Sequence, residues 1–481
     1  MTQTSQTFVP TPPEGLPQTL GELRAAGHRY RSVKEELREN LLARMRSGEQ
    51  RFPGIVGYDD TVLPEVERAL LAGHDMVLLG ERGQGKTRLI RSLVALLDEW
   101  TPMIAGSELN EDPMRPLTPA SQRRAREAGD DLPVAWLHRS LRYGEKLATP
   151  DTSVGDLIGD VDPIRIAQGR TLGDPETIHF GLVPRTNRGV FAVNELPDLA
   201  ERIQVSLLNV LEERDVQIRG YQLRLPLDLL LVASANPEDY TNRGRIITPL
   251  KDRFGAEIRT HYPVDLDLEL ELIRQEAALV APVPEHVLEV LARFARNVRE
   301  SPSVDQRSGV SARFAIAAAE TVAASALRRS GLLGEAEPVA RIGDAVSVTS
   351  TLRGKVEFES GEEGRESEIL AHLLRSATAE TFRAHLAGLD MSGFTALVAE
   401  GGVVETGDLV PADELLRQVG TVPGLAKALE RLGLGDGPTR GEAAAGVEFV
   451  LEGLHLTRRL AKDLTDDGRA RYRGADRGGR A

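Results

Sequence analysis

The sequence contains no cysteine among its 481 residues, which excludes disulfide bonds and thiolate metal sites. It also has no apolar run long enough to cross a bilayer, and residues 1–15 have neither the basic start nor the apolar stretch of a secretion signal. We therefore expect a cytoplasmic protein that does not enter a membrane. The formal net charge of −14 argues against a protein that mainly wraps nucleic acid, because such binding depends on many lysines and arginines.

The composition is that of an ordinary globular protein, with 41% hydrophobic and 27% charged residues. Residues 1–17 are rich in Thr, Gln and Pro and are typical of a flexible arm. Ser32 and Glu35 then predict a capping box, followed by an amphipathic helix whose apolar positions are Val33, Leu37, Leu41 and Met45. The Arg- and Gly-rich residues 468–480 favour a disordered tail.

The strongest motif is a glycine, four free positions and then Gly-Lys-Thr, at residues 80–87. An apolar run at 76–79 predicts a buried strand before it, and helical spacing begins at Thr87. Glycines at a strand-to-helix junction let backbone N–H groups surround phosphates, while Lys86 would meet the β- and γ-phosphates and Thr87 would bind Mg²⁺. The alternative is a Gly-rich turn with a chance lysine. The predicted nucleotide-binding residues are Gly80, Glu81, Arg82, Gly83, Gln84, Gly85, Lys86, Thr87 and Arg88.

A second signal is the apolar run 189–193 followed by Asn194 and Glu195. Polar side chains at the carboxyl end of a strand are typical of ligand sites in open α/β sheets. Glu195 is the candidate to orient the water that attacks the γ-phosphate, and Asn194 would hold Mg²⁺ through a water shell with an uncharged oxygen. The alternative is a buried strand followed by a helix cap.

A third strand is predicted at 229–235, and Asn236 at its carboxyl end would hydrogen-bond the attacking water or the γ-phosphate. Asn before Pro is also a common turn, so both interpretations stay open here. Residues 216–225 predict a β-hairpin carrying Arg219 and Arg224, either structural or facing a pore or partner. Residues 256–260 are strand-like, and Arg253 precedes them.

Other segments carry weaker signals. Residues 51–57 would line an adenine pocket or simply pack, and 134–137 is the next strand candidate. Residues 101–131 are a long polar segment, either a functional insertion or mobile, whose acidic cluster, Glu108, Glu111 and Asp112, is interpreted as a solvated loop rather than a cation site. After Pro263 the pattern becomes helical, with Arg313 in the first turn of an Ala-rich helix capped at Ser311.

On these residues the chain resembles AAA+ ATPases, and among them the ATPase (I) subunit of magnesium chelatase and related bacterial MoxR-like ATPases. The resemblance runs from about residue 51 to 353 and rests on 80–87, 188–197, the hairpin, 235–237 and 252–254. It implies an α/β fold: an N-terminal arm and helix at 1–50, an AAA+ P-loop core with a parallel sheet at 51–265, a helical lid at 266–355, and a C-terminal helical region at 356–481 with the basic tail.

The resemblance also implies roles for single residues. Lys86 and Thr87 would be the Walker A pair, Glu195 the Walker B catalytic glutamate and Asn236 the sensor 1 residue. Arg253 would be an arginine finger that completes the site of an adjacent subunit, and Arg313 the sensor 2 arginine. The family implies ATP and Mg²⁺ as cofactors, a homo-hexameric ring and a partner with a von Willebrand A-type domain.

Two departures from the family stand out. Asn194 replaces the usual Walker B aspartate, and the sequence after about residue 355 has no family match. The leading hypothesis is an Mg²⁺-dependent ATP hydrolase that remodels a partner protein, as a chaperone does, or metallates it. The partner would differ from that of a true chelatase subunit. The alternatives are a nucleotide-dependent assembly scaffold with weak hydrolysis, a sigma-54-type regulator and, through the hairpin arginines, a DNA helicase.

Overall fold

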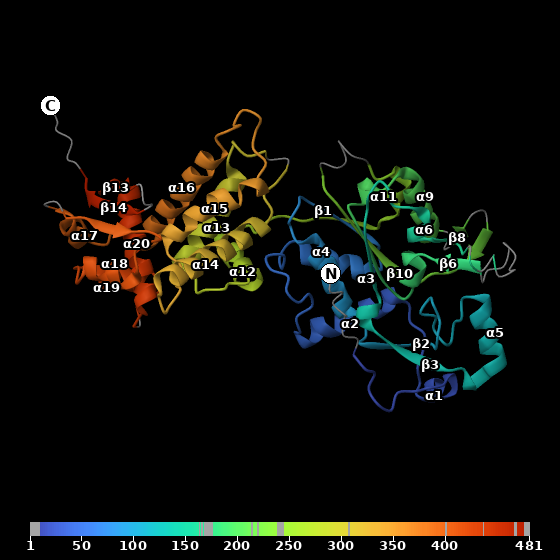
Figure 1. Ribbon diagram of the computed structural model, residues 1–481. Coiled ribbons are helices and arrows are strands. Elements are labelled where there is room, and N and C mark those ends of the chain that lie inside the picture. The colour runs from blue at the N-terminus through green and yellow to red at the C-terminus, as the bar shows by residue number, and fades with distance from the viewer. Residues whose placement is uncertain are drawn as a thin grey trace. The chain divides into compact units, whose positions relative to one another are not determined.

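The computed structural model describes residues 10–162, 164, 167, 177–212, 215–218, 221–237, 245–305, 308–399, 402–435, 437–465 and 469–475. The chain divides into two compact units, 1–261 and 262–481 (Figure 1). Within the described residues, no helix is long and apolar enough to cross a membrane.

The first unit is built on a five-stranded parallel sheet. Its strands are β1 (Met76–Leu79), β4 (Tyr143–Leu147), β7 (Gly189–Asn194), β10 (Leu229–Ala235) and β11 (Ala256–Arg259), and their order is β11-β1-β10-β7-β4. The strands β1, β7 and β10 are buried along their whole length, which explains their continuous apolar runs. The predicted α/β core with a parallel sheet is confirmed.

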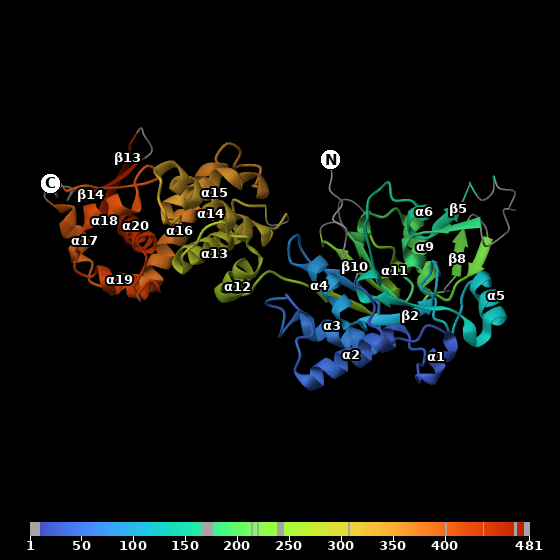
Figure 2. The same cartoon turned by 60° about the horizontal axis from the view of Figure 1, so that its bottom comes forward.

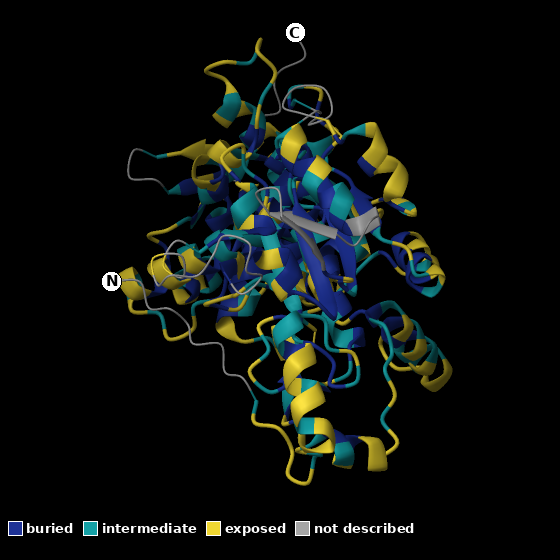
Figure 3. Ribbon diagram, turned by 90° about the vertical axis from the view of Figure 1, so that its right-hand side faces the viewer, coloured by how far each residue is buried: buried dark blue, intermediate teal, exposed yellow. Residues whose placement is uncertain are grey.

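Successive side chains along the strands point to opposite faces of the sheet, and each face packs in its own hydrophobic layer. Val190, Ala192 and Val232 face one layer, which includes helices α2 (Val33–Ser47), α3 (Val62–Ala72) and α4 (Lys86–Ser92). Phe191, Val193 and Ala233 face the other, which includes α6 (Val154–Leu157), α8 (Leu182–Arg185), α9 (Glu201–Glu212) and α11 (Thr248–Arg253). Figure 2 shows the helices around the sheet, and Figure 3 shows buried strands enclosed by helices with exposed outer faces.

Smaller elements complete the first unit. They are α1 (Leu20–Ala25), α5 (Pro119–Ala128) and three antiparallel pairs: β2 (Trp100–Ile104) with β3 (Val134–His138), β5 (Gly159–Val161) with β6 (Ile178–Phe180), and β8 (Asp215–Ile218) with β9 (Tyr221–Arg224). Short 3₁₀ helices lie at Leu93–Leu96, Gly129–Asp131, Arg139–Leu141 and Leu196–Asp198. The pair β8–β9 confirms the predicted hairpin; Arg219 lies outside the described residues.

Two predictions for the region after α4 need correction. The strand predicted at 134–137 exists, but β3 pairs with β2 outside the main sheet, and the core strand is β4. The interpretation of the acidic cluster as a solvated loop holds for Glu108, which is exposed, but is wrong for Glu111 and Asp112, which are buried. Glu111 accepts hydrogen bonds from the amides of Leu117 and Thr118, and Asp112 lies 3.1 Å from an Arg188 nitrogen.

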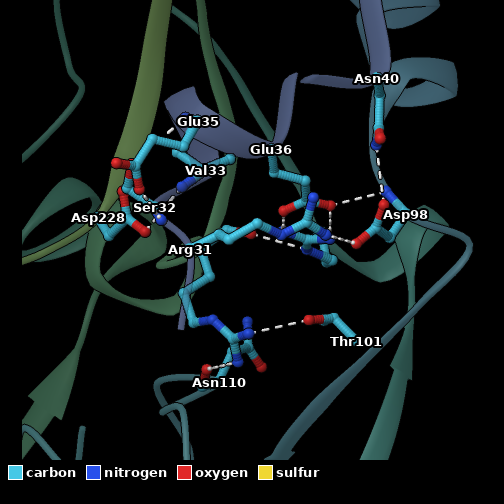
Figure 4. A network of polar contacts seen from close by, with 12 residues as sticks. Arg31, Ser32, Val33, Glu35, Glu36, Asn40, Asp98, Thr101, Asn110 and Asp228 are labelled. Atoms are coloured by element: carbon cyan, nitrogen blue, oxygen red, sulfur yellow. Dashed lines mark hydrogen bonds and ion pairs between the residues drawn. The ribbon is translucent and has the colours of Figure 1, made fainter. Parts of the chain in front are cut away.

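The predicted capping box is present at the start of α2, where Ser32 and Glu35 exchange hydrogen bonds. A buried ion pair fastens this helix to the sheet. Arg142 donates two hydrogen bonds to Glu36, at 2.7 and 2.6 Å, and a third to the carbonyl of Arg188 at 2.7 Å. The amide of Asp98 donates to the same Glu36 carboxylate at 2.7 Å (Figure 4). The helix is therefore part of the first unit's core.

The second unit is mainly helical. Its helices are α12 (Leu266–Glu276), α13 (Glu285–Glu300), α14 (Arg313–Leu333), α15 (Val346–Thr351), α16 (Glu366–Leu386), α17 (Ser392–Leu397), α18 (Ala412–Val419), α19 (Leu425–Arg431) and α20 (Arg440–Leu456), with 3₁₀ turns at Ile342–Ala345 and Arg353–Lys355. One hydrophobic core takes side chains from Leu270 through to Tyr472. The division at 355/356 between a lid and a C-terminal region thus stays a prediction.

A small antiparallel sheet accompanies these helices, in the order β12-β14-β13. Its strands are β12 (Val404–Thr406), β13 (Leu460–Leu464) and β14 (Ala470–Gly474). The prediction of a disordered tail is therefore wrong for 470–474. The arginines of this segment are paired: Arg471 contacts Glu405 at 2.7 Å and Arg473 contacts Asp463 at 2.7 Å.

Candidate functional site

The phosphate loop connects β1 to α4 at the carboxyl edge of the sheet. Gly80 follows the buried strand, and its amide donates to the carbonyl of Ala235 at 3.1 Å. Gly83 and Gly85 have φ angles of 73° and 79°, the left-handed region that favours glycine. The loop therefore turns sharply into α4 and places the N-terminus of this helix at the carboxyl edge of the sheet, as the motif predicts.

Side chains from two other segments brace this loop. The Thr260 hydroxyl donates to Gln84 Oε1 at 2.7 Å, and the Tyr58 hydroxyl donates to the carbonyl of Gln84 and, at 3.0 Å, to that of His261. Burial raises the pKa of Tyr58 to about 12, so its hydroxyl remains a donor at neutral pH. A Cβ on Gly80 would lie 2.0 Å from Thr260 Oγ1 and 2.2 Å from Gln84 Oε1. Only glycine fits at the first position of the motif without displacing these groups.

Lys86 and Asn236, two residues predicted for the site, are in contact. Lys86 Nζ donates to Asn236 Oδ1 at 2.9 Å, and to the carbonyls of Gly80 and Glu81 within the loop. The contact follows from the register, because Leu79 pairs with Ala235 and both strands end at the same edge. The structure therefore joins the loop lysine to the end of the neighbouring strand.

Asn194 and Glu195 lie at the end of β7, beside β10. Asn194 is 7% exposed, and its Oδ1 accepts a hydrogen bond from Ser234 Oγ at 3.1 Å. The amide of Glu195 donates to the same Ser234 hydroxyl at 3.3 Å. Glu195 has a φ of 56°, so the chain turns sharply after the strand and the carboxylate leaves the buried run. Ser234 thus ties Asn194 and Glu195 to the strand that carries Asn236.

A carboxylate from the edge strand β4 completes this cluster. Asn194 Nδ2 donates to Glu145 Oε1 at 2.6 Å, while Arg91 Nε of α4 and the Tyr143 hydroxyl donate to Glu145 Oε2, both at 2.9 Å. Burial alone would raise the pKa of Glu145, but the hydrogen bonds from Arg91, Tyr143 and Asn194 hold it below its usual value. The carboxylate is therefore charged at neutral pH.

The donor atoms here fit magnesium held mainly by a nucleotide. Mg²⁺ prefers oxygen ligands and keeps several waters when it binds phosphates. The Thr87 hydroxyl at the start of α4 and the Asn194 amide oxygen would offer oxygen atoms of this kind. Among the described residues, no group of three or more His, Cys, Asp or Glu side chains could hold a metal ion without a nucleotide.

Three predicted arginines are not brought to this cluster by any described contact. Arg88 lies against residues 51–57, because a Cβ on Gly54 would be 2.7 Å from its guanidinium. Arg253 is the exposed last residue of α11. Arg313 opens α14 in the second unit, where its amide donates to Ser311 Oγ at 3.1 Å. The roles of Arg253 and Arg313 stay predictions, as does an adenine pocket at 51–57.

Glu145, Ser234, Tyr58 and Thr260 were not predicted for the site. Glu145 stands in a short strand with two charged residues, which does not look like part of a core. Ser234 is a single hydroxyl within an apolar run, and its polarity in a buried strand was the signal that it needs partners.

The chain is similar in sequence to subunits of magnesium chelatase. The chain is 29% identical over 232 residues to magnesium-chelatase subunit ChlI-1 of Arabidopsis thaliana, covering 47% of this chain and 51% of that protein. It is 30% identical over 232 residues to the magnesium-chelatase 38 kDa subunit of Acidiphilium rubrum, covering 47% and 63%. The chain thus spans about half the length of the first of these relatives. No family model matches the chain.

Among solved structures, a complex between subunits BchI and BchD of magnesium chelatase matches with a TM-score of 0.36 and 23% identity, covering 66% of this chain and 98% of that one.

Proposed function

We propose that this chain is an Mg²⁺-dependent ATPase of the AAA+ type, because it is similar to the ATPase subunit of magnesium chelatase. The observation that carries the proposal is the contact of 2.9 Å between Lys86 Nζ and Asn236 Oδ1. It joins the phosphate loop to a polar side chain on the adjacent strand, while Glu195 is linked to that strand through Ser234. A lysine, an amide and a carboxylate at one sheet edge are the groups that phosphoryl transfer to water requires.

Each residue has a task in this proposal. The loop amides and Lys86 would bind the β- and γ-phosphates. Thr87 and Asn194 would hold the magnesium ion, which would neutralise the charge that develops on the phosphates. Glu195 orients the attacking water, and Asn236 fixes the γ-phosphate or that water. Arg253 reaches the site of an adjacent subunit, where such a residue contributes about 10³–10⁵ in rate. Arg313, the first residue of α14, is proposed as the sensor 2 arginine.

We further propose that hydrolysis is coupled to remodelling or metallation of a partner protein, in a homo-hexameric ring in the cytoplasm. The similarity to magnesium-chelatase subunits supports this assignment. A partner with a von Willebrand A-type domain belongs to the same proposal.

Steady-state ATP hydrolysis with and without Mg²⁺ tests the proposal. We expect Mg²⁺-dependent turnover that Glu195→Gln removes, loss of nucleotide affinity in Lys86→Ala, and normal affinity without turnover in Arg253→Ala. Arg259→Ala is the matched control, because Arg259 is also an exposed arginine of the first unit and its described ion pair, with Glu257, is a long one of 3.8 Å. Nucleotide binding and assembly without any ATP turnover would instead support the alternative function, a nucleotide-dependent assembly scaffold.

The placement of Arg253 has its own test. Rings mixed from Arg253→Ala and Glu195→Gln subunits should recover part of the hydrolysis, because some sites then combine an intact Glu195 with a neighbour's intact Arg253. No recovery in rings whose mixed composition has been verified would contradict an action between subunits.

A further inference from the structure

A neutral side chain occupies the position where the resemblance leads one to expect the Walker B carboxylate. Asn194 makes two hydrogen bonds in opposite senses: Oδ1 accepts from Ser234 at 3.1 Å, and Nδ2 donates to Glu145 at 2.6 Å. The amide is therefore fixed between a hydroxyl on β10 and a carboxylate on β4. A negative charge is present at this edge of the sheet, one strand away from its usual position.

Glu145 is held in place by groups from three elements. Arg91 on α4, Tyr143 on its own strand and Asn194 on β7 all donate to its two oxygens. The register pairs Glu145 with Ala192, two residues before Asn194, so both polar side chains lie on the face that α4 covers. The Glu145 side chain is 22% exposed, so water screens its charge only in part.

We propose that Glu145 is a positioning residue for the magnesium ion and supplies, through Asn194, the charge that the asparagine lacks. The inference rests on the proposed function, because it concerns the ion bound with ATP. Donation to a carboxylate polarises the amide and increases the negative partial charge on Oδ1, the oxygen offered to the ion. Partners of this kind tune metal affinity by about 10–100-fold.

The same contact explains why asparagine suits position 194. An aspartate there would set a second carboxylate at hydrogen-bond distance from Glu145, and two like charges so close repel each other. Residues 145 and 194 therefore form a matched pair with one negative charge between them. Exchanging the charge, as in Asn194→Asp with Glu145→Gln, preserves the total and keeps one amide and one carboxylate in contact.

The experiment measures metal binding without turnover. Mn²⁺ replaces Mg²⁺, its binding is followed by electron paramagnetic resonance in the presence of a non-hydrolysable ATP analogue, and binding of the analogue is also measured in EDTA. We expect Glu145→Gln to weaken Mn²⁺ binding about tenfold while binding of the analogue in EDTA is unchanged. Asn194→Asp alone should also bind Mn²⁺ more weakly than the exchange variant, which should return to within about threefold of the wild type.

Glu257→Gln is the matched control, because Glu257 is an ion-paired carboxylate on the opposite edge strand, with an oxygen 3.2 Å from the Lys251 nitrogen. Unchanged Mn²⁺ affinity in Glu145→Gln, or an exchange variant no better than Glu145→Gln alone, would overturn the inference. Wild-type protein that binds no analogue, with or without Mn²⁺, would instead refute the proposed function. If Glu145→Gln does not fold, the comparison of Asn194→Asp with the exchange variant still decides the question.

Discussion

Replacing Arg142 with methionine is expected to lower the free energy of unfolding of the first unit by about 3–5 kcal/mol. The Arg142 side chain is 0% exposed and that of Glu36 is 6% exposed, so the change leaves a carboxylate buried without its counter-ion. It also removes two hydrogen bonds to Glu36 and one to the carbonyl of Arg188. The hydrogen bond from the Asp98 amide (Figure 4) and the charges of Arg31 and Arg188 remain, but none of them replaces the direct ion pair.

Urea unfolding of the full chain, followed by circular dichroism, measures this loss. Arg24→Met is the matched control, because Arg24 pairs with Asp130 in the same unit but both side chains are more than half exposed, at 56% and 67%. An exposed pair contributes about 0–1 kcal/mol. Glu36→Leu combined with Arg142→Met should regain part of the loss, since no buried charge remains. If Arg142→Met costs no more than Arg24→Met, the reasoning from burial is wrong.

Two further predictions concern buried groups elsewhere. His286 is buried against Phe449, and burial, with the nearby His385, lowers its pKa from 6.5 to about 3. Because the unfolded chain takes up this proton first, stability is lost as pH falls below about 6.5, by about 2 kcal/mol between pH 7.5 and 5. Chemical denaturation across this range should show that the free energy of unfolding of His286→Phe depends less steeply on pH than that of the wild type. His372→Gln, a change at an exposed histidine, is the control and should behave like the wild type. Equal pH dependence in all three proteins would exclude His286 as the source of the loss. Gly80→Ala should lower the free energy of unfolding by about 1–3 kcal/mol and weaken nucleotide binding, because the added Cβ would clash with Thr260 and Gln84. Thermal unfolding and nucleotide titration measure the two effects. Gly331→Ala is the control, because a Cβ there meets open space and should not destabilise the protein; equal effects of the two changes would contradict the clash.

The parts of the fold and site predicted from sequence are those that short-range chemistry determines. The phosphate loop needs its glycines and lysine at fixed spacing, and the capping box at Ser32 and Glu35 closes within one helical turn. Fully buried strands such as β7 and β10 can be recognised in the sequence as continuous apolar runs, because both of their faces are buried. These features do not depend on what the rest of the chain does.

The features that were missed depend on partners far along the chain. The core strand β4 lies at the sheet edge and tolerates Glu145 and Lys146, so its sequence resembles a loop. Glu111 and Asp112 are buried because distant amides and Arg188 satisfy them, which no local pattern reveals. The basic segment that forms β14 is ordered by acidic partners such as Glu405, 66 residues before Arg471.

The asparagine at position 194 shows how the two kinds of information combine. In the sequence, Asn194 is a neutral residue where the resemblance leads one to expect an aspartate, and Glu195 beside it is unchanged. This loss of one negative charge, taken alone, predicts weak magnesium binding. In the fold, its amide nitrogen is committed to Glu145 and its oxygen is oriented by Ser234, so the side chain has one defined face for a cation. An asparagine and a neighbouring glutamate carry the same total charge as an aspartate beside a neutral residue. Turnover should therefore depend on residue 145 as well as on residue 194, and the two positions should be mutated together rather than singly.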